Sequence, residues 1–347
     1  MIRRFLLTLV LLPMLILPTG AIDYTAPAVP ESAQPYMPED TASFSDGLWY
    51  IIRSVIREVM PNITEAFTVC VSVVGIVLLL SVFESFSEAG KRLAILIATV
   101  AIGSVVLNST NSLINLGVET ITQISDYGKL LIPAITGALA AQGGVTTSAA
   151  LYAGTMFFST LLTGIISGVI VPMIYIYIAL CIADRVVPNQ SLSGMKQFIK
   201  WLATWSVKII LYVSTAYLGI TGVISGSVDS TAVKATKLAI SGAVPIVGGI
   251  LSDASETVLL SAKILKNSIG IYGLLAFFSI SVAPFLQIAV QYILTKITAA
   301  VCSVFGNKRV SSLVGDFSGA MGLILAMTGA ACLLYLISVV CFMKGVL

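Results

Sequence analysis

The chain has 347 residues, of which 57% are hydrophobic and 10% are charged, and its formal net charge is +3. A soluble domain carries roughly 25% charged residues, and the mean hydropathy here is +1.02. This composition excludes a soluble globular enzyme and a disordered chain, and it predicts an all-α polytopic membrane protein. The sequence contains no histidine, which excludes Ser-His-Asp and Cys-His catalysis and the usual zinc sites. We therefore expect no enzyme, no metal site and no cofactor.

The N-terminal residues 1–21 have the pattern of a secretory signal peptide. Arg3 and Arg4 precede a 13-residue apolar run, and small residues follow at 19–21. The alternative is an uncleaved first helix. Residues 22–46 are polar and hold four prolines, which predicts an extended, poorly ordered arm outside the cytoplasm.

The next two segments bring the chain into the membrane. In residues 47–60, apolar side chains recur at helical spacing, with Arg53 and Arg57 on the other side. This pattern predicts an amphipathic helix lying in the membrane interface, and the alternative is a simple extension of the first span. Residues 61–129 hold the first transmembrane pair, because two stretches of about 20 apolar residues each are long enough to cross a bilayer.

Four further spans follow, at about 150–183, 201–223, 267–294 and 317–343, which gives about six crossings. Two shorter apolar segments, 130–144 and 238–251, are interrupted by glycine and proline and are predicted to be re-entrant. The residues that interrupt them are Pro133, Gly137, Gly143, Gly144, Gly242, Pro245, Gly248 and Gly249.

An internal repeat with an offset of 112 residues relates these segments. Pro133 corresponds to Pro245, and Pro172 to Pro284. We read residues 130–226 as the first repeat and 227–347 as a linker and the second. Paired interrupted segments in two repeats indicate a transport site near the bilayer middle, whereas the alternative is that they serve only packing. Three basic residues in each repeat loop favour parallel copies, but the lysines between 229 and 266 favour inverted ones.

A polar helix face adjoins the second interrupted segment. Because Asp253, Glu256, Lys263 and Asn267 follow one another at intervals of three, seven and four residues, they lie on one side of a helix. Such a face suits a vestibule or a partner subunit, and the alternative is a solvated face at the interface. Its members are Ser252, Asp253, Glu256, Lys263 and Asn267. Nothing in the charge pattern indicates nucleic-acid binding.

Two stretches carry a resemblance to a known family. They are AVPIVGGILSDASETVLLSAKILKNSIGIYGLLAF, residues 243–277, and APFLQIAVQYILTKITAAVC, residues 283–302. They resemble the stage III sporulation protein AE family, and the resemblance covers most of the mature chain. It implies endospore formation in a Firmicute and a place in the outer forespore membrane, on the mother-cell side. It also implies partners encoded by the same operon and a forespore membrane protein across the intermembrane space.

The resemblance implies a channel or feeding-tube complex and no assigned catalytic residues. Two hypotheses follow. In the first, the chain is a permease-like transport component of that complex. In the second, it is a non-conducting membrane scaffold that anchors ring-forming partners. Membrane lipid and further copies of the chain are the other expected partners.

Overall fold

The structure is a computed structural model, and it describes an almost entirely helical chain without β-strands in the described part, which confirms the all-α prediction. The residues described are 27–39, 43–86, 90–186, 190–243, 248–305 and 308–344. Within the helices, only the backbone is described for residues 61–62, 85–86, 91–92, 221–243, 248–266, 305, 308–309 and 344.

The predicted number of crossings is confirmed, because six helical runs in the described part are long and apolar enough to span a membrane. A short 3-10 helix, η1 (Gln34–Tyr36), precedes them. The runs are α2 (Phe44–Phe86), α3 (Lys91–Ala141), α4 (Val145–Ile165) continued through the π-helical turn η2 (Ile166–Ile170) into α5 (Val171–Val186), α6 (Gln190–Ala243), α7 (Gly248–Phe305) and α8 (Lys308–Lys344).

These helices are much longer than a bilayer is thick. α3 has 51 residues, which at 1.5 Å per residue makes it about 75 Å long. The hydrocarbon core of a membrane is about 30 Å thick and needs about 20 residues. A large part of the bundle therefore lies outside the hydrocarbon.

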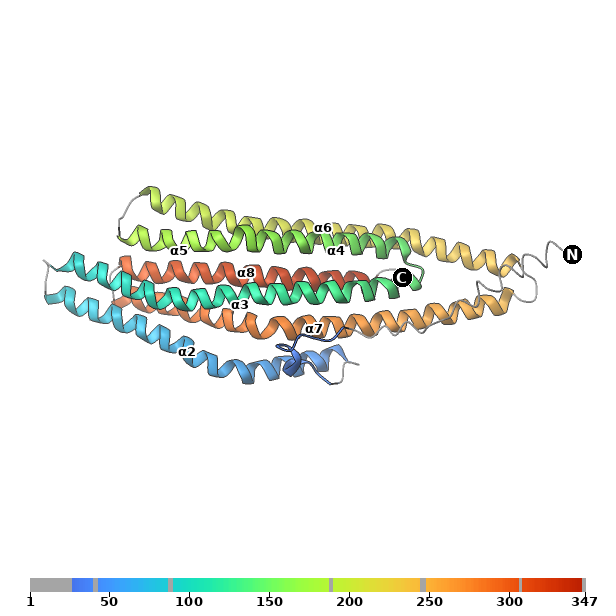
Figure 1. The fold of residues 1–347 in the computed structure, drawn as a ribbon, viewed down its shortest axis with the longest axis horizontal. Helices are drawn as coiled ribbons and strands as arrows, with labels where there is room; N and C mark the ends of the chain where they lie inside the picture. The colour runs from blue at the N-terminus through green and yellow to red at the C-terminus, as the bar shows by residue number, and fades with distance from the viewer. Residues whose placement is uncertain are drawn as a thin grey trace.

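The runs lie side by side along the long axis of the molecule (Figure 1). At one end α2 meets α3, α5 meets α6, and α7 meets α8, and we call this the basic end. The basic residues that lie at its connections are Lys91, Arg92, Arg185, Lys196, Lys308 and Arg309. Both predicted repeat loops lie at this end. The 112-residue repeat itself stays a prediction.

α8 occupies the centre of the bundle and packs against α3, α4, α5, α6 and α7 (Figure 1). Many of its apolar residues recur at helical spacing and are almost wholly buried, among them Phe317, Ile324 and Tyr335. At Tyr335 the packing is close, because the ring lies against Gly128 of α3 and stacks on Phe277 of α7.

The π-helical turn has a cause in the sequence. Pro172 has no N–H, so it cannot pair with the carbonyl four residues before it. The helix widens by one residue just ahead of it, and the Val171 N–H donates to the carbonyl of Ile166, five residues back. The α4–α5 run therefore passes the proline without ending.

The predicted re-entrant segment at 130–144 is not confirmed, because the helix is not interrupted at Pro133 or Gly137. α3 continues through Pro133 and Gly137 to Ala141, and only Gln142–Gly144 leaves the helix. Pro133 lies exposed on the outer surface, while Leu131, Ile132 and Ile135 beside it are fully buried. Burial of these side chains offsets the roughly 3 kcal/mol that an interior proline costs a helix.

The break that does occur is a turn between antiparallel helices. Gly143 has φ 94°, a left-handed conformation that side chains other than glycine rarely adopt, and Gly144 directly precedes α4. In the second segment, Gly242 lies in α6, Gly248 and Gly249 begin α7, and Pro245 lies outside the described residues. A second re-entrant segment is thus not confirmed.

The N-terminal part is described from residue 27 on. Residues 47–60 belong to the continuous helix α2, and the interfacial helix and the extended first span both stay predictions for them. Its apolar face packs on α7, where Ile51 and Val55 cluster with Leu275. The arm is not free over residues 27–39, because Ala33 and Tyr36 are buried against the bundle.

Candidate functional site

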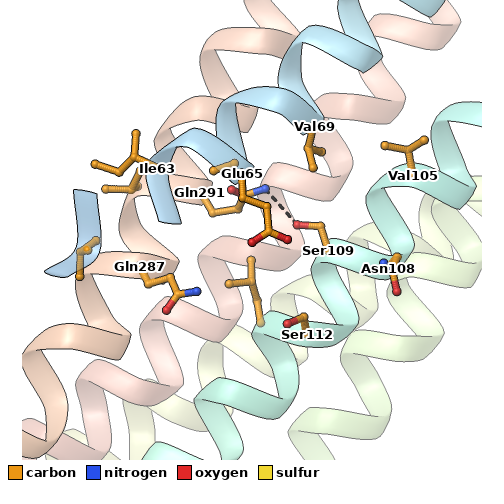
Figure 2. Close-up of a pocket in the computed structure, with 13 residues that line it drawn as sticks. Ile63, Glu65, Val69, Val105, Asn108, Ser109, Ser112, Gln287 and Gln291 are labelled. Atoms are coloured by element: carbon orange, nitrogen blue, oxygen red, sulfur yellow. Dashed lines mark hydrogen bonds between the residues drawn. The ribbon is translucent and has the colours of Figure 1, made fainter. Parts of the chain in front are cut away.

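A pocket of about 300 Å³ lined by polar residues lies between α2, α3 and α7. Figure 2 shows Glu65 of α2 projecting into it beside Ser109 and Gln291. The Gln291 Nε2 donates to the Ser109 Oγ at 3.0 Å, which joins α7 to α3 across the pocket. The polar residues that line it are Glu65, Asn108, Ser109, Ser112, Gln287 and Gln291.

These polar groups lie within apolar helices. Each belongs to one of the runs that can cross a membrane, namely Ile63–Glu84, Leu93–Ala141 and Asn267–Val304. Polar side chains in such spans are costly when they face lipid, and they usually face a bundle interior or a water-filled cavity. The pocket provides that cavity.

A second pocket of about 200 Å³ adjoins the first and shares Val59 and Gln287 with it. We call the two together the polar groove. The second pocket is lined in part by Pro284 and Ile280 of α7. Because Pro284 has no N–H, the Ile280 carbonyl lacks its partner four residues on, and such a group in a membrane protein requires another polar group or water. Water in the adjoining pocket could supply that partner.

The N-terminal arm closes one side of the second pocket. Ser32 Oγ donates to Gln123 Oε1 of α3 at 2.8 Å, and Tyr36 also lines the pocket. Burial, together with the hydrogen bond to Glu58 of α2, raises the pKa of Tyr36 to about 12. Tyr36 is therefore neutral at physiological pH and can donate to the Glu58 carboxylate.

A separate network of buried charges lies near the basic end. Asp316 of α8 accepts from Arg185 of α5 at 2.7 Å and from Lys196 of α6 at 2.8 Å. Lys196 also donates to Asp184 at 3.1 Å. The side chains of Lys196 and Asp184 are 8% and 9% exposed, so the two charges compensate each other away from water. The network ties three helices together and is neutral as a whole.

The predicted polar face of α7 is only partly described. Asn267 is half-buried in α7. Ser252, Asp253, Glu256 and Lys263 lie in the same helix, where the structure describes the backbone alone. A vestibule on this face stays a prediction. Pro133 and Gly137 line neither pocket of the polar groove.

The residues of the polar groove were not singled out from the sequence, although signals exist. Gln287 and Gln291 are four residues apart in an otherwise apolar stretch, which places two carboxamides on one helix face. Asn108 lies near the end of the second predicted span. The pairing of these two helix faces with Glu65 depends on tertiary packing, which single-helix periodicity does not give.

The fold and the groove define a class, namely a multi-pass α-helical membrane protein with a polar groove between its helices. A sequence profile of the stage III sporulation protein AE family matches residues 36–345. The chain belongs to this family. It is 21% identical over 299 residues to stage III sporulation protein AE of Bacillus subtilis strain 168, covering 85% of this chain and 75% of the relative. No solved structure matches significantly.

Proposed function

We propose that this sporulation membrane protein is a permease-like component of a channel complex between mother cell and forespore, in which the polar groove carries solute. The observation that supports this most is the groove itself: carboxylate, carboxamide and hydroxyl groups gather inside helices that span the membrane. Hydroxyl and carboxamide pairs between helices also serve packing, but a carboxylate such as that of Glu65 in a membrane-spanning run is typical of a water-filled cavity or a solute path.

The proposal includes an orientation. Basic residues near span ends favour the cytoplasmic side, so the basic end faces the mother-cell cytoplasm. The N-terminal arm and the second pocket then face the intermembrane space. Proteins of the same operon and a forespore membrane protein meet the chain on that side, in the outer forespore membrane.

A scaffold function is the second candidate, and one observation favours it. α6 and α7 have 54 and 58 residues, so each is about 80 Å long or more and projects well beyond the hydrocarbon. Helical projections of this length offer partners a platform. On this hypothesis the groove is a structural feature that conducts nothing.

The experiment that tests this proposal introduces a large side chain into the first pocket of the polar groove. Ser112 of α3 lines the first pocket, and Ser112→Trp places an indole in it. We expect forespore reporter expression to fall to near background in sporulating cells, with membrane protein level and partner co-purification unchanged. Ser104→Trp is the matched control, because Ser104 is exposed on the same helix and lines neither pocket. Loss of co-purification in Ser112→Trp would support the scaffold, and normal reporter expression would contradict a conducting groove.

A further inference from the structure

The polar groove has charges of a single sign. Glu65 lines the first pocket, and Glu58 and Glu119 line the second. Among the described residues, no lysine or arginine lines either pocket, and none forms an ion pair with these three carboxylates. The nearby Lys129 of α3 is already paired with Asp126, at 2.8 Å. The groove thus presents negative charge without a counter-ion from the described part of the protein.

A buried carboxamide points to the kind of ligand. Gln291 is 4% exposed. Its amide nitrogen donates a hydrogen bond to the Ser109 hydroxyl oxygen at 3.0 Å. Figure 2 shows this pair next to the Glu65 carboxylate. Carboxylate, carboxamide and hydroxyl oxygens accept hydrogen bonds, and an ammonium group has donors only. An anion placed here would meet the Glu65 carboxylate and be repelled by it.

Size and geometry restrict the ligand further. A volume of about 300 Å³ is at the lower end for small-molecule sites. In the described residues, no three Asp, Glu or Cys side chains lie close enough together to hold a metal ion. These two facts favour a small organic cation over a tightly coordinated metal.

We propose that the polar groove binds a small organic ammonium compound, with Glu65 as its counter-ion and the Ser109–Gln291 pair as its hydrogen-bonding neighbour. The inference deepens the proposed function, because it names the chemical class of solute that the groove takes. Glu58 and Glu119 attract the same cation at the outer pocket.

The test measures the charge preference of the groove directly. Ser112→Cys is introduced into a variant whose five native cysteines are alanine, and the full chain is reconstituted in liposomes. Modification rates are measured with a cationic methanethiosulfonate, the trimethylammonium ethyl reagent, and with the anionic sulfonatoethyl reagent. Rates with the free thiol 2-mercaptoethanol in solution correct for the intrinsic difference between the two reagents. We expect the corrected cation-to-anion ratio to be about tenfold or more, because one carboxylate a few ångströms away is worth at least about 1.4 kcal/mol at intermediate dielectric constant.

Two further variants test whether Glu65 causes the preference for the cationic reagent. Glu65→Gln is expected to bring the corrected ratio close to one, and Asp126→Asn, outside the groove, to leave the ratio unchanged. 1,4-Diaminobutane is expected to slow modification of the introduced thiol, whereas sodium chloride of equal ionic strength is expected to slow it much less.

The outcomes separate the inference from the proposed function. Equal rates for the two reagents, an unchanged ratio in Glu65→Gln, or equal protection by sodium chloride would overturn the ammonium site and leave a hydrated groove standing. Failure of both reagents at Ser112→Cys, with normal reaction of the denatured protein, would overturn the groove and the transport function together.

Discussion

Asp316→Ala is expected to destabilise the protein by about 3–5 kcal/mol, the cost of removing one partner from a buried ion pair. Asp316 compensates two cations, Arg185 at 2.7 Å and Lys196 at 2.8 Å. Without it, Asp184 alone faces two positive charges. Because Lys196 is 8% exposed, water cannot replace the lost carboxylate without opening the α5–α6–α8 contact.

The measurement is the unfolding midpoint of the purified protein in mild detergent, followed by circular dichroism in denaturant. Asp126→Ala is the matched control. Its pair with Lys129 is also 2.8 Å long, but the side chains are 62% and 57% exposed, so a loss of about 1 kcal/mol or less is expected. Equal losses in the two variants would show that the network near the basic end does not hold the helices together.

Gly128→Ala is expected to destabilise the protein by about 1–3 kcal/mol, the usual cost of overpacking a core. A Cβ at this position of α3 would overlap the ring of Tyr335. The ring cannot withdraw easily, because it stacks on Phe277 at 5.1 Å and its hydroxyl contacts Ser159 and Ser125.

Gly164→Ala provides the comparison for this glycine. Gly164 and Gly168 form a GxxxG pattern that can bring helices together, yet a Cβ added to either would have no neighbouring atom within 4 Å among the described residues. Because alanine is the better helix former by about 1 kcal/mol, Gly164→Ala is expected to be neutral or slightly stabilising. The same unfolding measurement checks both, and a Gly128→Ala protein as stable as Gly164→Ala would contradict the packing of α3 on α8.

The number of spans was predictable because each span is a long apolar run, and that signal is local to the helix. The places where helices end were harder to predict. Pro133 and Gly137 reduce helix propensity, but Leu131, Ile132 and Ile135 are buried by other helices, and this tertiary packing outweighs the local signal. Tertiary packing also acts on the amphipathic stretch at 47–60, where Ile51 and Val55 are buried beside Leu275 of α7.

The polar groove and the charge network were not predictable in the same way. Asp184 and Asp316 are 132 positions apart, and Gln291 and Ser109 are 182 apart. Each residue alone reads as an ordinary polar residue in a helix. These residues meet only because helices that are distant in sequence pack together. Hydrophobic periodicity within a single helix does not indicate such long-range pairs.

The central claim is that the polar groove is open to water inside a membrane-spanning bundle. The most direct measurement is a single-cysteine scan of α3 from residue 104 to 115, in sporulating cells, with a membrane-impermeant maleimide. The claim predicts labelling at 108, 109 and 112, on the face that lines the pocket, and little labelling at Ser104 and Leu107 on the outer surface. Absence of labelling at 109 and 112, with the denatured protein fully reactive, would contradict it.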